Sequence, residues 1–486
     1  MTGHGVVVEA LAAVRSASAS AWLVGGAVRD RLLGRATTDY DVAVDGDVRA
    51  VARAAAKAAG GHAFELSEGF GGWRVVPRRG RTPERVAGGS GPGWQLDLLP
   101  LLNGSIEADL GLRDFTVNAL AEELQDGGEV IDPFGGRRDL DERRLRMVSS
   151  EAFERDPLRT LRLARLACEI GFQIEPGTAA AARHGAPSLD RVSPERIFEE
   201  LKRILMSPDA PSGLEDMDEL GVTAAVLPEL GQLHGIEQSR FHHLDVYAHT
   251  ISVLAETADL ERMPDRYLGP HWQEVDALLS TPLAHQLTRW QALRFGALLH
   301  DIAKPQTRGV LPDGRVTFMG HDAIGAEQAV EILSRLRAGQ RLREYVAILV
   351  RHHLRLGFLV HERPLSRRSI YRYLKGVGEF AVDVTVLSVA DRLATRGDRS
   401  TEAIAAHLEL AGQMLGEALA WRAKPPRPPL RGDELAAALD VSPGPVIGAL
   451  LGELEEASFA GEVGSREDAV VLARELLERE RGQYSL

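Results

Sequence analysis

The feature that most constrains this chain is the block LVGGAVRDRLLGRATTDYDVAV at positions 23–44. Trp22–Val24 is a short apolar run that ends in Gly25-Gly26, which predicts a strand followed by a turn. Ala27–Leu33 has helical spacing, and Thr38–Val44 alternates as a second strand does. Such a compact strand–turn–helix–strand unit is typical of a domain that packs helices on a small sheet.

The character of the chain changes near Glu151. Before it, Ala50–Ala59 predicts another helix and Gln95–Leu99 another strand; after it, helical patterns continue to the last residue. At roughly 100–200 residues per domain, 486 residues predict three or four domains. Breaks in the helical region are expected near Ser207–Gly213, Pro228–Gly235, Glu362–Pro364 and Ala423–Pro429.

Composition limits the class of protein. The single cysteine, Cys168, excludes an intramolecular disulfide and fits a reducing compartment. No run of about 18 apolar residues occurs and the N-terminus lacks a basic leader, so we expect a cytoplasmic protein without a membrane span. A net charge of −13 does not by itself indicate a nucleic-acid binder. Residues 137–165, however, carry nine arginines against six acids, and such a local arginine face suits RNA.

Two aspartates are the first candidate site. Asp39 and Asp41 are two apart on a predicted strand, so their carboxylates lie on one face. Carboxylates held side by side repel each other unless a cation neutralises them. Mg²⁺ is the expected partner because it prefers oxygen ligands and is commonly shared with substrate phosphates. Asp97, on the strand predicted at Gln95–Leu99, is a candidate third carboxylate.

An anion site is predicted immediately before these aspartates. Gly25 and Gly26 precede a helix, and backbone N–H groups at a helix start bind anions, while glycine allows a close approach. Arg29 lies one turn into that helix, within reach of a phosphate. The block therefore combines a phosphate cradle with a metal-binding strand.

This block closely resembles the signature of class II tRNA nucleotidyltransferases and bacterial poly(A) polymerases. The resemblance continues in DLGLRDFTVNALA (109–121), DPFGGRRDLDERRLR (132–146) and ERDPLRTLRLARLA (154–167). It implies an α+β fold: a polymerase-β-like head with a small mixed sheet, followed by an all-α neck, an HD domain and a tail. The domain boundaries that we expect are 1–146, 147–232, 233–400 and 401–486.

The resemblance also implies roles for individual residues. Asp39 and Asp41 match catalytic metal ligands, and Asp156 with Arg159 matches the pair that reads the incoming base. An aspartate acceptor and an arginine donor can imitate a Watson–Crick edge, which would select CTP and ATP without a nucleic-acid template. Nucleotide-binding roles are implied for Gly25, Gly26, Arg29, Arg113, Asp114, Asn118, Asp156, Arg159, Arg162 and Arg165.

The reaction implied is attack of an RNA 3′-OH on the α-phosphorus of the nucleotide, assisted by two Mg²⁺ ions. We expect CCA to be added to tRNA from CTP and ATP. Many CCA-adding members carry a basic loop before the RDFT motif, but no basic residue lies between Asp97 and Arg113 here. A CC-adding enzyme is therefore an alternative, as is a poly(A) polymerase. The arginine-rich segment 78–85 precedes Asp97 and is a candidate substitute for that loop.

A second constellation lies in the helical region. The segments DVYAHTISVL, LLHDIAKP, GHDAIGAE, RHHL and SVADRLAT resemble the HD phosphohydrolase superfamily. The resemblance implies a divalent metal, of an identity that the sequence leaves open, and a metal-bound water that attacks a phosphoester. The candidate metal ligands are His249, His300, Asp301, His321, His352, His353 and Asp391, with either or both of His352 and His353 serving.

The histidine–aspartate cluster leaves two alternative hypotheses open. An HD phosphohydrolase with a degenerate head is an alternative function, and a degenerate HD fold that only supports tRNA is the structural alternative for the cluster. We expect tRNA, CTP and ATP as partners, with neither DNA nor a membrane, and the sequence indicates no oligomeric state.

Overall fold

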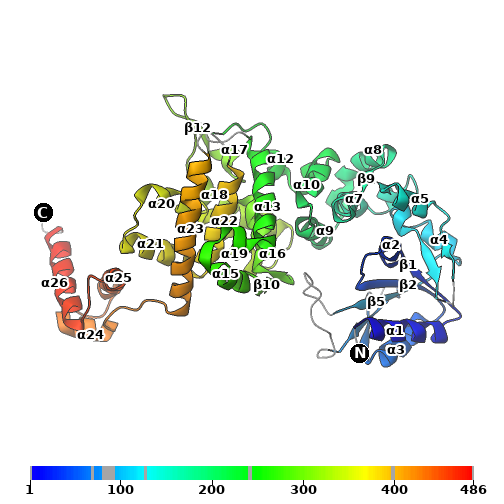
Figure 1. Cartoon of the computed structure of the whole chain (residues 1–486), viewed down its shortest axis with the longest axis horizontal. Helices are drawn as coiled ribbons and strands as arrows, with labels where there is room; N and C mark the ends of the chain where they lie inside the picture. The colour runs from blue at the N-terminus through cyan, green and yellow to red at the C-terminus, as the bar shows by residue number, and fades with distance from the viewer. Residues whose placement is uncertain are drawn as a thin grey trace. The chain divides into compact units, whose positions relative to one another are not determined.

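The computed structural model describes residues 3–66, 71–78, 93–124, 128–238, 244–395 and 400–483, and its chain forms two compact units, residues 1–231 and 232–486 (Figure 1). The mixed sheet followed by a largely helical region confirms the expected α+β class. Within the described residues, no helix has both the length and the apolar character needed to cross a membrane.

The first unit begins with a seven-stranded sheet in the order β3-β4-β5-β2-β1-β6-β7. Strand β5 runs parallel to β2, and the other neighbours are antiparallel. The strands are β1 (Ser20–Val24), β2 (Asp39–Asp45), β3 (Gly61–Glu65), β4 (Trp73–Pro77), β5 (Gln95–Pro100), β6 (Ala121–Glu123) and β7 (Val130–Ile131).

Helices α1 (Gly3–Ala17) and α3 (Val48–Ala58) pack against each other, and α3 covers β3, β4 and β5. The buried face of α3 carries Val51, Ala52 and Ala55, which follow helical spacing. Helix α2 (Gly26–Leu32) follows β1 after one residue and contacts β2. The predicted strands and helices of residues 22–59 and 95–99 are present with ends shifted by one or two residues.

The remainder of the first unit is mainly helical. Helix α7 packs on α9 and α10 through buried leucines and isoleucines such as Leu163 and Ile204. The elements of this part of the first unit are α4 (Ile106–Leu110), α5 (Gly136–Asp141), β8 (Arg144–Leu145), α6 (Ala152–Arg155), α7 (Leu158–Ile170), β9 (Gln173–Ile174), α8 (Pro176–Gly185), α9 (Pro194–Met206), α10 (Ala210–Glu219), α11 (Val222–Val226) and α12 (Pro228–Gly231), with 3₁₀ turns η1 (Thr116–Asn118) and η2 (Ala186–Arg191).

The second unit centres on α16, which packs against α13, α19 and α22. A buried ion pair between Arg289 and Asp383, with Tyr345 donating to Asp383 at 2.7 Å, ties α16, α22 and α19 together. The larger elements are α13 (Val246–Arg262), α15 (Trp272–Leu279), α16 (Arg289–Leu299), α17 (Lys304–Thr307), β12 (Arg308–Val310), β13 (Val316–Phe318), α18 (His321–Arg335), α19 (Gln340–His352), α20 (Arg355–Leu359), α21 (Arg367–Val377) and α22 (Ala381–Ala394).

The end of the chain comprises α23 (Ser400–Ala423), α24 (Gly432–Leu439), α25 (Pro445–Ala460) and α26 (Arg466–Gln483). The last three helices share a small core of leucines and alanines. Helix α25 contacts α21, where Arg368 pairs with Glu456 at 3.2 Å and Glu462 at 2.6 Å. The predicted breaks agree with the ends of α9, α12 and α23, whereas most of the arginine-rich segment 78–85 lies outside the described residues.

Candidate functional site

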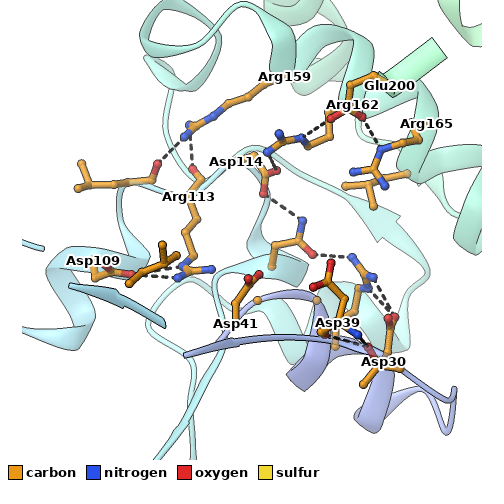
Figure 2. A pocket seen from close by; sticks show the side chains of 18 of the residues that line it. Asp30, Asp39, Asp41, Asp109, Arg113, Asp114, Arg159, Arg162, Arg165 and Glu200 are labelled. Atoms are coloured by element: carbon orange, nitrogen blue, oxygen red, sulfur yellow. Dashed lines mark hydrogen bonds and ion pairs between the residues drawn. The ribbon is translucent and has the colours of Figure 1, made fainter. Parts of the chain in front are cut away.

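A cavity of about 600 Å³ lies in the first unit (Figure 2). Its wall is formed by the start of α2, strand β2, the η1 turn, and helices α7 and α9. Every residue predicted for the head site lines this cavity except Asp97 and Asp156. The lining residues predicted from the sequence are Gly25, Gly26, Arg29, Asp39, Asp41, Arg113, Asp114, Asn118, Arg159, Arg162 and Arg165.

Three carboxylates form a cluster on the sheet. Asp39, Asp41 and Asp97 each place one oxygen within 4.8 Å of the other two. Burial and the nearby charge of Asp39 raise the pKa of Asp41 to about 7, because a second negative charge here is poorly solvated. A divalent cation would remove that repulsion, and an all-oxygen donor set suits a hard cation. The residues present therefore fit a metal ion.

The turn between β1 and α2 is the place where the sequence predicts an anion cradle. Gly25 has φ +70°, and a Cβ placed there would lie 2.8 Å from Nη1 of Arg113. That guanidinium is held in turn by Asp109, whose Oδ2 accepts from Nη2 at 3.2 Å. Arg29 donates from Nη1 to Oδ1 of Asn118 at 2.7 Å. Two arginines from separate segments of the chain are thus held beside the turn.

We expect Gly25→Ala to reduce kcat/KM for CTP by about 10²-fold, because a methyl group here both strains the backbone and displaces Arg113. The measurement is single-turnover nucleotide incorporation with the full chain. Gly34→Ala is the matched control, since Gly34 also has a positive φ but has open space around it. Equal losses in both variants would contradict a specific role for the cradle.

A hydrogen-bond network runs from the cradle to helix α7. Asn118 donates from Nδ2 to Asp114 at 3.0 Å, and Asp114 accepts from Arg162 at 3.2 Å. Arg162 also donates to Glu200 of α9 at 3.2 Å, so it lies between two carboxylates (Figure 2). Arg165 donates to the other oxygen of Glu200 at 2.5 Å. Burial opposes ionisation of Asp114, but Arg162 and the donated hydrogen bonds outweigh it and lower the pKa of this carboxyl.

Asp156 and Arg159 lie apart from this network. Arg159 donates to the backbone carbonyls of Leu112 at 2.7 Å and Arg113 at 3.1 Å. Asp156 accepts from Arg196 at 2.8 Å and does not line the cavity. In this structure the two side chains predicted to read the base are therefore each engaged by other groups of the protein.

Asp109, Glu200 and Arg74 are among the residues of this region that were not predicted from the sequence. Asp109 orients Arg113, and its position four residues earlier on a short helix is a local signal that could have identified it. Glu200 and Arg74 carry no such signal, because they meet Arg162 and Asp97 only through the tertiary fold.

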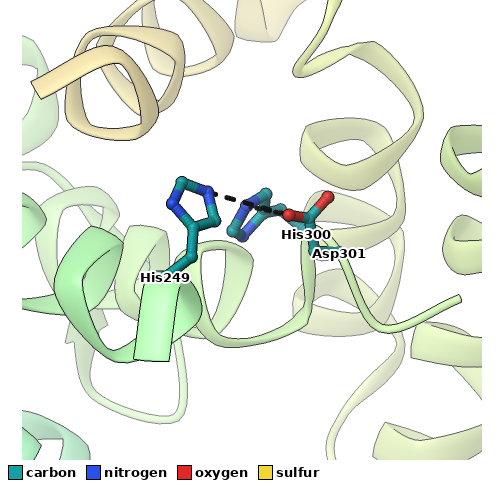
Figure 3. Close-up of side chains that lie close together, drawn as sticks. All are labelled: His249, His300 and Asp301. Atoms are coloured by element: carbon teal, nitrogen blue, oxygen red, sulfur yellow. Dashed lines mark ion pairs between the residues drawn. The ribbon is translucent and has the colours of Figure 1, made fainter. Parts of the chain in front are cut away.

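The second unit brings most of the predicted HD residues together around Asp301. Figure 3 shows one part of this cluster, His249 and His300 beside Asp301. On one side, His300 Nε2 lies 3.1 Å and His249 Nε2 lies 3.7 Å from Asp301 Oδ2. On the other side, His321 Nε2 lies 3.3 Å and His353 Nε2 lies 3.8 Å from Oδ1. Asp391 adds a carboxylate 3.1 Å from His249 Nε2.

The hydrogen bonds of these histidines test whether a metal fits. In His300, His321 and His353, Nδ1 lies 2.8, 2.6 and 2.7 Å from a backbone carbonyl three residues earlier. A carbonyl only accepts, so Nδ1 donates to it and Nε2 faces the cluster, where a neutral imidazole would offer its lone pair to a metal. The Nε2 atoms of His321 and His353 are 3.3 Å apart. Two facing lone pairs repel without a cation between them, so the donor set fits two metal positions that share Asp301.

The two adjacent histidines differ. His353 is buried and belongs to the second group, whereas the half-buried His352 belongs to neither group among the described residues. Burial and the charges of Arg355 and Arg351 lower the pKa of His352 to about 4. Lys304, which sequence reasoning did not single out, lies 2.6 Å from Asp301. A cavity of about 870 Å³, with Phe318 and Phe358 in its wall, opens beside the cluster.

Three known family models match successive parts of this chain. The poly(A) polymerase head domain matches residues 21–146, and a model described as "Probable RNA and SrmB-binding site of polymerase A" matches 171–233. The HD domain matches 246–396. Nucleotidyltransferases and HD proteins are divalent-metal-dependent families, and both candidate clusters lie inside the matched ranges.

Several known proteins are similar to this chain over most of its length. The A-adding tRNA nucleotidyltransferase of Deinococcus radiodurans is 38% identical, covering 92% of this chain and 93% of that protein. The CC-adding enzyme of Thermus thermophilus is 36% identical, covering 92% of both. Among solved structures, the Thermotoga maritima CCA-adding enzyme complexed with tRNA has a TM-score of 0.59 at 19% identity, covering 98% of this chain and 99% of that one. The chain therefore belongs to the tRNA nucleotidyltransferase family and is a nucleotidyltransferase with a poly(A) polymerase head and an HD domain.

Proposed function

We propose that this enzyme adds CCA to the 3′ ends of tRNA from CTP and ATP in the cytoplasm. The observation that carries the proposal is one continuous wall of side chains in the head cavity. It joins the cluster of Asp39 and Asp41 to the cradle at Gly25 and, through Asn118 and Asp114, to the arginines of α7. A nucleoside triphosphate has the same sequence of parts: metal-bound phosphates, a ribose and a base.

The chain's own residues supply binding and orientation. Arg29 and Arg113 neutralise the triphosphate, which lies against the backbone of Gly25 and Gly26. Because Arg29 is held by Asn118 and Arg113 by Asp109, little rearrangement is needed when the phosphates bind. Asp156 and Arg159 are the proposed base-reading pair, and they must exchange their present partners for the base edge.

Asp39 and Asp41, with Asp97 adjacent, are the residues that would hold Mg²⁺. Bound Mg²⁺ would supply activation of the tRNA 3′-OH and stabilisation of the departing pyrophosphate. The cation would also offset the burial and the charge repulsion that together raise the pKa of Asp41. No other catalytic group is needed, since nucleotidyl transfer depends mainly on positioning and charge neutralisation.

The nucleotides added are tested with tRNA transcripts that end before CCA, after C and after CC. Each transcript is incubated with labelled CTP, ATP and Mg²⁺, and the products are sized at nucleotide resolution. Each candidate activity predicts a different set of added nucleotides. We expect complete CCA on the first transcript. Termination after CC would identify a CC-adding enzyme, addition only to the CC-ending transcript an A-adding enzyme, and long A tails a poly(A) polymerase. Absence of incorporation on all three transcripts would contradict the proposal.

We further propose that the HD unit hydrolyses phosphoesters. The specific observation is the pair of histidine groups that share Asp301, with the three Nδ1 protons fixed on backbone carbonyls. His249, His300, Asp301, His321, His353 and Asp391 are the residues that would hold divalent metal. Lys304 provides a positive charge beside the cluster, and the adjoining cavity has room for a substrate of nucleotide size.

A further inference from the structure

An arginine of the neighbouring strand β4, Arg74, lies next to the carboxylate cluster on the same face of the sheet. Strand β4 pairs with β5 so that Arg74 is opposite Asp97, and β5 pairs with β2 so that Asp97 is opposite Asp41. Directly opposed residues of neighbouring strands present their side chains on the same face. Arg74, Asp97 and Asp41 therefore form a row, with one positive charge at its end and two negative charges following it.

The contact between Arg74 and Asp97 occupies both oxygens of the carboxylate. Nε donates to Oδ1 at 2.6 Å and Nη2 donates to Oδ2 at 2.6 Å. Such a fork is the strongest geometry that an arginine and a carboxylate adopt. The side chain of Asp97 is only 12% exposed, so water replaces this partner poorly. A divalent cation needs lone pairs of the same oxygens, and it must also approach a fixed positive charge.

We propose that Arg74 is a positioning residue that keeps Asp97 out of cation binding while no nucleotide is bound. This inference rests on the proposed function, because it takes the three aspartates as the cation site. Asp39 and Asp41 then hold the cation alone, and binding is weak until a triphosphate contributes its own oxygens. Arg74 thereby couples retention of the cation to arrival of the nucleotide.

The test is a titration of the full chain with Mn²⁺ in the absence of nucleotide. Electron paramagnetic resonance measures the concentration of free Mn²⁺ at each point and so gives the binding isotherm. The part of the isotherm that Asp41→Asn removes is assigned to the head, which separates it from the HD cluster. We expect Arg74→Gln to tighten this part by about tenfold, because Asp97 becomes available and a repelling charge is lost. Arg74→Lys keeps the charge without the fork, and we expect it to tighten binding by about twofold.

Asp97→Asn supplies the decisive comparison. In the Asp97→Asn background, Arg74→Gln should change Mn²⁺ affinity by less than about twofold, because Arg74 affects cation binding through Asp97. Arg138→Gln is the matched control: Arg138 is an exposed arginine of the same unit that pairs with Glu142, and its loss should have no effect. As a second readout, Mn²⁺ should raise the thermal unfolding midpoint of Arg74→Gln more than that of the wild type.

The Mn²⁺ measurements can overturn three separate claims: the role of Arg74, the part played by Asp97 and the assignment of the aspartates as the cation site. Unchanged or weaker head binding of Mn²⁺ in Arg74→Gln and Arg74→Lys overturns the role of Arg74 while leaving the cation site in place. Equal tightening with and without Asp97 shows a general charge effect and overturns the part played by Asp97. If Asp41→Asn removes no Mn²⁺ binding, the aspartates are not the cation site, and this inference and the metal part of the proposed function both fall.

Discussion

Asp41→Asn is expected to reduce nucleotide incorporation into tRNA lacking its CCA end by at least about 10³-fold. Asp41 belongs to the carboxylate cluster and also lines the cavity, so its charge serves both the cation and the phosphates. The amide has the same shape but cannot carry that charge. The measurement is single-turnover incorporation of labelled CTP at saturating Mg²⁺, with circular dichroism to confirm that the variant is folded.

The matched control is Asp45→Asn, which makes the same change at the exposed end of the same strand. We expect that variant to incorporate CTP at the wild-type rate. Phosphoester hydrolysis by the HD unit should be unchanged in both variants, because that cluster lies in the other compact unit. Wild-type incorporation by Asp41→Asn would contradict the assignment of the head cavity as the site of nucleotidyl transfer.

Asp301→Asn should abolish hydrolysis of a chromogenic phosphodiester and remove bound divalent metal from the HD unit. Each carboxylate oxygen of Asp301 lies near the Nε2 atoms of two histidines. Among the described residues, Asp301 is the one that belongs to both groups. Losing one negative charge from such a shared ligand weakens both metal positions. Metal content by inductively coupled plasma mass spectrometry and the hydrolysis rate are the two measurements, with tRNA end addition as the activity expected to persist.

Two neighbouring histidines provide the internal control for this second prediction. His353→Gln should lower metal content and hydrolysis, whereas His352→Gln should leave both near the wild-type values. The substitutions are identical and adjacent, so general damage to the end of α19 would affect both alike. The opposite pattern, with metal lost only in His352→Gln, would show that the ligand assignment is wrong.

Much of the fold and of both candidate sites followed from local patterns. The strand and helix between Trp22 and Leu33 were predicted from an apolar run, two glycines and a helical repeat. The i, i+2 spacing placed Asp39 and Asp41 on one face, and adjacency placed His300 and Asp301 at the end of α16. Strands β3 and β4 were not predicted, because neither GHAFE nor WRVVP alternates apolar and polar residues over its length. The catalytic and binding roles of individual residues stay predictions that the experiments above test.

By itself, the sequence determined the fold class, and it predicted a phosphate cradle and two candidate metal clusters, because each depends on spacing along one strand, one turn or one helix. Only the tertiary structure decided which side chains meet. It pairs Arg74 with Asp97, places Glu200 between two arginines of α7, and selects His353 over His352 for the shared site on Asp301. These contacts join residues on separate elements, and their distances are set by sheet register and helix packing, which no local pattern specifies.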